Sequence, residues 1–233
     1  MKKLILSFLS ITLFLFAETD HILISEIVIS PTDGEYIKIT NPTNNTVDLT
    51  DYYLTDATDT STSSFYYNLP SGNNFHSGSS SDFTARFPAG YSINSGESVI
   101  IAIDETRYNN EYGEMPDLAI KSDFLNAVDG INSIGLAPTY LDNFSETIVL
   151  FYWDGTSDIV KDVDYILWGD KKCAVDKTGI STYLNDTPID QQEFAPYHVE
   201  GKKLQRISNE GSETSSGGTV SYTHLTLPTK RIV

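Results

Sequence analysis

The chain has 233 residues, which is enough for one sizeable β-domain or two small ones. It contains 15 Lys and Arg against 32 Asp and Glu, a formal net charge of −17 at pH 7. Nucleic-acid binding depends on Lys and Arg side chains that displace counterions from phosphate, so this acidic balance argues against a nucleic-acid partner. Cys173 is the single cysteine, so an intrachain disulfide is excluded and the fold must depend on its core.

Residues 1–17 have the pattern of a signal peptide. Lys2 and Lys3 form a positive start, an apolar run covers residues 4–16, and Ala17 offers a small residue for cleavage. The apolar run is too short to span a membrane comfortably, and no other segment reaches that length. We therefore expect an exported protein that is secreted, periplasmic or attached to the cell surface, with no transmembrane segment.

Alternating apolar residues predict strands at the start of the mature chain. Residues 21–30 alternate around four isoleucines, and residues 35–40 alternate again. Residues 31–34 between them indicate a hairpin loop in which Gly34 is free to take a positive φ. Pro42 ends the second strand, because proline lacks the N–H that a central ladder needs.

Residues 55–82 differ from their surroundings because they are rich in Ser, Thr, Asn and Gly. A loop of this length inside a domain is often functional or irregular. It contains the aromatic residues Phe65, Tyr66, Tyr67 and Phe75. If exposed, these rings would form a contact surface for a protein or glycan ligand. The alternative is that they fold back over one open end of the domain.

The second half of the chain continues the strand pattern. Residues 98–103 form a short apolar strand, while proline and glycine restrict residues 104–129 to short helices at most. Residues 148–153 are the most hydrophobic strand, and residues 159–167 return as its hairpin partner after a tight turn. A last strand is predicted at residues 204–207. This pattern predicts an all-β protein with the architecture of a β-sandwich.

The sequence has no catalytic motif, since the zinc helix HExxH, the nucleophile elbow GxSxG and a phosphate-binding loop are all absent. We therefore predict no catalytic and no cofactor-binding residues. Asp158, Asp162 and Asp164 lie on the 148–167 hairpin, and the period of two places Asp162 and Asp164 on one face. Calcium takes carboxylate oxygens in irregular loops, so these three residues are candidate ligands. The alternative is a solvated acidic surface that keeps the protein soluble.

Residues 24–54 resemble the lamin tail domain. The matching elements are Ile24-Ser25-Glu26-Ile27, Glu35-Tyr36-Ile37-Lys38-Ile39, Asn41-Pro42-Thr43, Val47-Asp48-Leu49, Tyr52 and Leu54. Tyr52 stands where the family usually has Trp, Lys38 where an acidic residue is common and Asp51 where Gly is common, but no core position is lost. The resemblance implies an immunoglobulin-like β-sandwich of lamin-tail type, with long irregular loops and at most short helices.

Residues 21–218 as a whole are similar to a narrower group of exported bacterial lamin-tail proteins. The matching blocks include residues 151–165, 174–179 and 204–207. This similarity implies adhesion or scaffolding in the envelope without enzymatic activity. Residues 219–233 depart from the group and contain no Asp or Glu, so we interpret them as a non-native tail that arises from a sequence artefact.

These observations predict three parts: a signal peptide over residues 1–17, a lamin-tail-like β-sandwich domain over residues 18–218, and the tail over residues 219–233. The predicted function is that of an exported, non-catalytic binding or structural module with a protein or glycan partner. No cofactor is expected apart from the candidate calcium. The alternative is an accessory domain of a truncated exported nuclease or hydrolase.

Overall fold

The computed structural model describes residues 19–56, 58–59, 63–137, 140–177, 179–180, 182–183, 188–192, 194–206 and 225–226. Residues 58–59 and 225–226 are described by their backbone alone. The predicted signal peptide over residues 1–17 lies outside the described residues, as does most of the predicted tail over residues 219–233. The division of the chain into three parts therefore stays a prediction.

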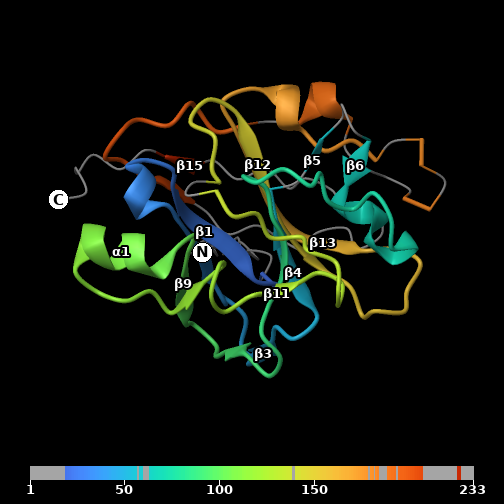
Figure 1. The fold of residues 1–233 in the computed structure, drawn as a ribbon, viewed down its shortest axis with the longest axis horizontal. Helices are drawn as coiled ribbons and strands as arrows, with labels where there is room; N and C mark the ends of the chain where they lie inside the picture. Colours follow the sequence, from blue (N-terminus) through green and yellow to red (C-terminus); the bar gives the residue numbers. More distant parts are fainter. Residues whose placement is uncertain are drawn as a thin grey trace, which may run out of the picture.

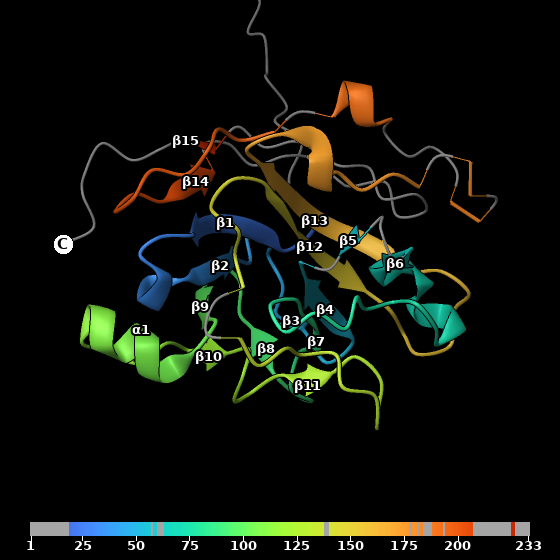
Figure 2. The same ribbon diagram turned by 45° about the horizontal axis from the view of Figure 1, so that its top comes forward.

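Figure 1 shows the fold, and Figure 2 labels every strand of the first of the two main sheets. This sheet has six described strands in the order β10-β9-β2-β1-β14-β15. Its strands are β1 (Leu23–Val28), β2 (Tyr36–Thr40), β9 (Ser98–Ala102), β10 (Leu118–Ala119), β14 (Leu204–Arg206) and β15 (Leu225–Thr226). Neighbouring strands are antiparallel, except that β10 runs parallel to β9. The strands predicted within residues 21–40 and 98–103 are confirmed.

The second sheet has five described strands in the order β11-β7-β4-β12-β13, all antiparallel. Its strands are β4 (Tyr52–Thr55), β7 (Thr84–Arg86), β11 (Leu125–Asn126), β12 (Glu146–Tyr152) and β13 (Lys161–Trp168). Two short pairs lie outside both sheets: β3 (Val47–Asp48) with β8 (Ser92–Ile93), and β5 (Thr58–Asp59) with β6 (Ser64–Phe65). The predicted hairpin is the β12–β13 pair.

Helices in the described part are short, as predicted. They are α1 (Glu105–Tyr112) and the 3₁₀ turns η1 (Thr32–Gly34), η2 (Tyr66–Ser71), η3 (Lys171–Cys173) and η4 (Ile189–Gln191). Asp104 caps α1 by accepting a hydrogen bond from the Arg107 backbone N–H, and Gly113 ends the helix in the left-handed region. Within the described part, no helix combines the length and apolar character that a membrane crossing requires.

Gly34 serves a different purpose from the one predicted. It is not among the described glycines with positive φ, and η1 forms the turn between β1 and β2. A Cβ atom at Gly34 would lie 2.6 Å from the hydroxyl oxygen of Tyr112 on α1. A side chain at position 34 would therefore displace the Tyr112 ring, because the helix packs directly against the turn.

Apolar side chains occupy three layers of the molecule. The largest cluster lies between the sheets and includes Ile27, Ile37, Leu54, Ile148 and Leu150, each fully buried. A second cluster covers the outer face of the second sheet, and a third lies between the first sheet and α1. Burying a side chain of this size contributes about 1.5–3 kcal/mol. The β-sandwich prediction is confirmed, with an additional apolar layer outside each sheet.

The C-terminal segment, which we define as the described residues between 169 and 206, passes from the second sheet to the first. In both views it is the orange chain above the sheets, and Figure 2 shows that it ends at β14 (Figures 1 and 2). A parallel bridge between Trp168 and Ala195 ties it to the end of β13. This path brings the side chains of the segment against both sheets.

Candidate functional site

A β-bulge in the β12–β13 hairpin determines where two buried aspartates point. Leu150 pairs with Asp164 and Phe151 pairs with Asp162, so Val163 is inserted between two consecutive pairs. Leu150 faces the core between the sheets and Phe151 faces the outer cluster. Paired residues point to the same side of a sheet, so the two aspartates face opposite sides. The prediction that they share one face is wrong, because a strict period of two holds only where no residue is inserted.

Asp164 points into the core between the sheets and joins three strands. Its side chain is fully buried and accepts hydrogen bonds from the backbone N–H of Ile24 at 2.5 Å and from Arg206 Nη2 at 2.5 and 2.7 Å. The Arg206 side chain is only 4% exposed, and its Nε donates to the Ile24 carbonyl at 3.0 Å. The ion pair thus connects β13 to both β1 and β14.

Asp162 points to the outer side of the second sheet, where it meets Lys177. The Lys177 side chain is 0% exposed and that of Asp162 is 3% exposed, and an ion pair joins them. The Tyr66 hydroxyl contacts both groups, accepting from Lys177 Nζ at 3.0 Å and donating to the Asp162 oxygens at 2.8 Å. Charges buried this deeply must be paired and hydrogen-bonded to be tolerated, and both conditions are met.

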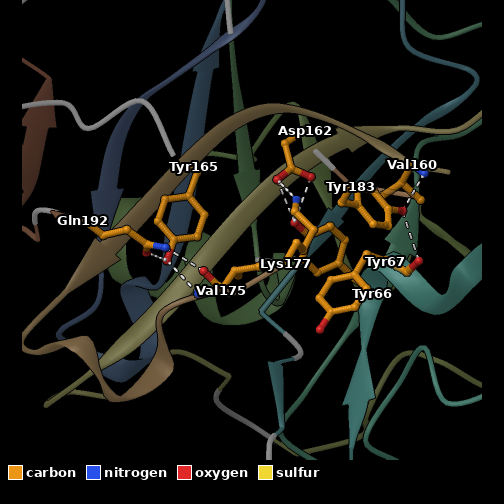
Figure 3. Close-up of polar contacts among 9 residues, drawn as sticks. All are labelled: Tyr66, Tyr67, Val160, Asp162, Tyr165, Val175, Lys177, Tyr183 and Gln192. Atoms are coloured by element: carbon orange, nitrogen blue, oxygen red, sulfur yellow. Dashed lines mark hydrogen bonds and ion pairs between the residues drawn. The ribbon is translucent and has the colours of Figure 1, made fainter. Parts of the chain in front are cut away.

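Three tyrosine rings surround the Lys177 ammonium (Figure 3). Its Nζ lies 5.4 Å from the ring centroid of Tyr66, 6.0 Å from that of Tyr67 and 5.3 Å from that of Tyr183. These distances are within the range of cation–π attraction. The Tyr183 hydroxyl accepts from the Val160 backbone N–H at 3.0 Å and donates to the Tyr67 carbonyl at 3.2 Å. We call Asp162, Lys177 and the three tyrosines the lysine cage.

Hydrogen bonds beside the lysine cage position the chain that carries Lys177. The Tyr165 hydroxyl accepts from the Val175 backbone N–H at 3.2 Å, and Gln192 Nε2 donates to the Val175 carbonyl at 2.6 Å (Figure 3). Lys177 itself lies outside any helix or strand, so periodicity gives no reason to select it. Lys177 falls inside residues 174–179, a block on which the predicted similarity to exported bacterial lamin-tail proteins rests, and this prediction was the signal that could have found it.

The aromatic residues predicted as ligand contacts are mostly interior. Tyr66, Tyr67 and Phe75 are 0%, 8% and 3% exposed, and they pack on the outer face of the second sheet. Tyr66 packs against Phe151 with ring centroids 5.0 Å apart. Phe65 is half-buried and stacks on Tyr67. The prediction that Tyr66, Tyr67 and Phe75 are exposed is therefore wrong. Their rings pack against the apolar residues on the outer face of the second sheet. The alternative placed the rings over one open end of the domain, whereas Tyr66, Tyr67 and Phe75 fold back over the outer face of the second sheet.

The three predicted calcium ligands are not brought together. Asp158 is exposed on the hairpin turn, whereas Asp162 and Asp164 are buried with Lys177 and Arg206 as their counterions. In the part of the chain that the structure describes, no group of three or more His, Cys, Asp and Glu side chains could hold a metal ion. Calcium binding at these residues stays a prediction that the geometry does not favour.

A second candidate site is a cavity of about 500 Å³, whose lining includes Asp82, Glu146 and Cys173. Burial raises the pKa of Glu146 to about 8. Burial and the nearby Glu146 charge raise the pKa of Asp56. Burial also raises the pKa of the Cys173 thiol, which lowers its thiolate fraction and hence its reactivity. The raised pKa of Glu146 weakens the negative charge that this cavity presents at pH 7.

Comparison with known proteins places the fold. The Lamin Tail Domain family model matches residues 17–167, more than half of the 233 residues, and the chain belongs to the lamin tail domain family. The predicted resemblance and the predicted immunoglobulin-like β-sandwich are both confirmed.

One solved structure shows a weaker similarity. It is the crystal structure of a DUF4876 family protein from Bacteroides thetaiotaomicron VPI-5482, with 13% sequence identity and a TM-score of 0.44. The match covers 84% of this chain and 65% of that chain, so this chain spans less than two thirds of that protein. No curated protein matches the sequence.

Proposed function

We propose that this chain is an exported, non-catalytic structural or binding module that acts in the cell envelope or outside the cell. Its role is adhesion or scaffolding, with a protein or glycan as partner. Membership of the lamin tail domain family supports a β-sandwich module, and the signal-peptide pattern of residues 1–17 supports export.

The observation that carries the proposal is the way the C-terminal segment is fastened. Three of its cations pair with acids of the two sheets: Lys177 with Asp162, Arg206 with Asp164, and Lys203 with Glu26. The first two pairs are buried, and Lys203 is 28% exposed beside a buried Glu26. Breaking a buried pair by removing one partner costs about 3–5 kcal/mol. The three ion pairs fasten the C-terminal segment to both sheets, and the Arg206–Asp164 pair also joins the two sheets to each other. Such contacts suit a module that has a single cysteine and hence no intrachain disulfide.

Export is tested by fractionation of bacteria that express the full chain. The wild-type chain should appear outside the cytoplasm with residues 1–17 removed. Leu9→Arg places a charge in the apolar run and should hold the chain in the cytoplasm. Leu136→Arg is the matched control, because Leu136 is 85% exposed on the folded domain and should leave export unchanged. A wild-type chain that stays in the cytoplasm at full length would contradict the proposal.

The absence of catalysis is tested separately with DNA. The purified full chain is incubated with linear and supercoiled DNA in magnesium and in calcium, with EDTA as control. We expect intact DNA, because a strongly acidic protein repels it. Cleavage that EDTA abolishes would replace this proposal with the nuclease alternative.

A further inference from the structure

The lysine cage places an amine and a carboxylate in contact under conditions that favour their condensation. Lys177 Nζ bonds to an Asp162 oxygen, and both side chains are sealed from solvent. We propose that Lys177 and Asp162 form an intramolecular isopeptide bond, an amide between Lys177 Nζ and Asp162 Cγ. This inference is independent of export and of any binding partner.

Burial supplies the driving force for the bond. An ion pair in an apolar interior retains part of the cost of removing two charges from water. An amide replaces both charges by a neutral group. Two groups held in reactive contact behave as if one were present at roughly 10⁵–10⁸ M, so the entropic cost of bringing them together is already met by folding. The tyrosine rings also exclude the water that hydrolysis of the amide would need.

Tyr66 is placed to move the protons. Its hydroxyl accepts from Lys177 Nζ at 3.0 Å and donates to the Asp162 oxygens at 2.8 Å, so it contacts both reacting groups. General acid–base catalysis requires a group within this reach of the proton it transfers.

The steps balance as a simple condensation. One proton passes from the ammonium to the carboxylate, which leaves a free amine and a carboxylic acid. The amine lone pair attacks Asp162 Cγ, and the C–N bond forms. The Tyr66 hydroxyl gives its proton to the departing Asp162 hydroxyl and regains one from the attacking nitrogen. The C–O bond breaks, one water molecule is released, and no oxidant or reductant is consumed.

The cross-link would strengthen the attachment of the C-terminal segment to the two sheets. Asp162 stands at the start of β13, and Lys177 belongs to the C-terminal segment that covers the outer face of the same sheet. An amide between them would fix this segment covalently, in a chain whose single cysteine excludes an intrachain disulfide.

Intact-mass spectrometry of the purified full chain tests the proposal. The wild-type protein should be one water molecule lighter than the mass calculated from its own N-terminus. Lys177→Arg keeps the charge but removes the nucleophile, and Asp162→Ala removes the electrophile, so both should show their full calculated masses. Asp162→Asn should lose ammonia instead of water and reach the same final mass as the wild type, because the amide product is identical.

Tryptic digestion locates the bond. Cleavage after Lys177 should fail, and a branched peptide should join residues 162–171 to residues 173–202. Tyr66→Phe keeps the ring and deletes the hydroxyl, so the cross-linked fraction after a fixed time should fall. An unchanged fraction would overturn the role of Tyr66. A wild-type protein at its full calculated mass, or a water lost from another peptide, would overturn the cross-link itself.

Discussion

Removal of the Arg206 side chain should destabilise this protein far more than removal of an arginine from its surface. In Arg206→Met a long apolar side chain preserves most of the packing, but the fully buried Asp164 loses its counterion. The backbone N–H groups of Ile24 and Tyr165 still donate to Asp164, yet neither carries a net charge. We expect a loss of about 3–5 kcal/mol in the free energy of unfolding. A domain is typically stable by only about 5–15 kcal/mol, so this is a large fraction.

The matched control is Arg107→Met. Arg107 pairs with Asp33 at 2.5 Å, but the two side chains are 35% and 55% exposed. Exposed pairs contribute about 0–1 kcal/mol, because water screens them and two long side chains must be ordered. Urea unfolding followed by circular dichroism gives the loss in the free energy of unfolding for each variant. The comparison holds provided that the dependence of that free energy on urea concentration is unchanged.

A second change separates the charge from the contact. Asp164→Asn in the Arg206→Met background leaves an oxygen to accept from Ile24 and removes the unpaired charge. The double variant should therefore recover part of the stability that Arg206→Met loses. Equal losses in Arg206→Met and Arg107→Met would refute the reasoning, since they would mean that water reaches Asp164.

Three further outcomes are expected. Burial raises the pKa of Glu35 from 4.5 to about 7, so the folded state holds a proton there that the unfolded state releases. This contribution to the free energy of unfolding is complete when the pH is below 4.5, the pKa of Glu35 in the unfolded chain. It is lost as the pH rises through about 7, and the loss amounts to about 3 kcal/mol. Glu35→Gln should flatten the decline in urea stability between about pH 5 and about pH 8, although Glu146 keeps a slope of the same sign; an unchanged slope would remove Glu35 from the explanation. Gly169→Ala should cost about 3 kcal/mol or more, because φ is +82° and the new Cβ would lie 1.7 Å from the Phe144 carbonyl oxygen; a wild-type melting temperature would show that this turn is not as close-packed as described. Thermal unfolding in EDTA and in millimolar calcium should coincide, because Asp162 and Asp164 already have counterions; a calcium-specific rise, absent with magnesium, would reinstate the predicted site.

Local pattern was enough to predict the framework of this domain. The alternation in β1 and β2 and the apolar run of β12 with its return in β13 depend only on neighbouring residues and on which side each faces. The same pattern gave the wrong faces for Asp162 and Asp164 within β13. A single inserted residue at Val163 reverses the alternation there, and nothing in the sequence marks the insertion. Polar surroundings likewise suggested exposed rings at Tyr66 and Tyr67, although composition does not say which surface a loop will cover.

The sequence by itself determined the class of protein: its strands, its lamin-tail resemblance and its acidic balance. Only the tertiary structure decided which charges meet. Lys177 lies 15 residues from Asp162, Arg206 lies 42 residues from Asp164, and Lys203 lies 177 residues from Glu26. The physical reason is that strand formation follows from local alternation, whereas the partner of a buried charge depends on the path of the whole chain.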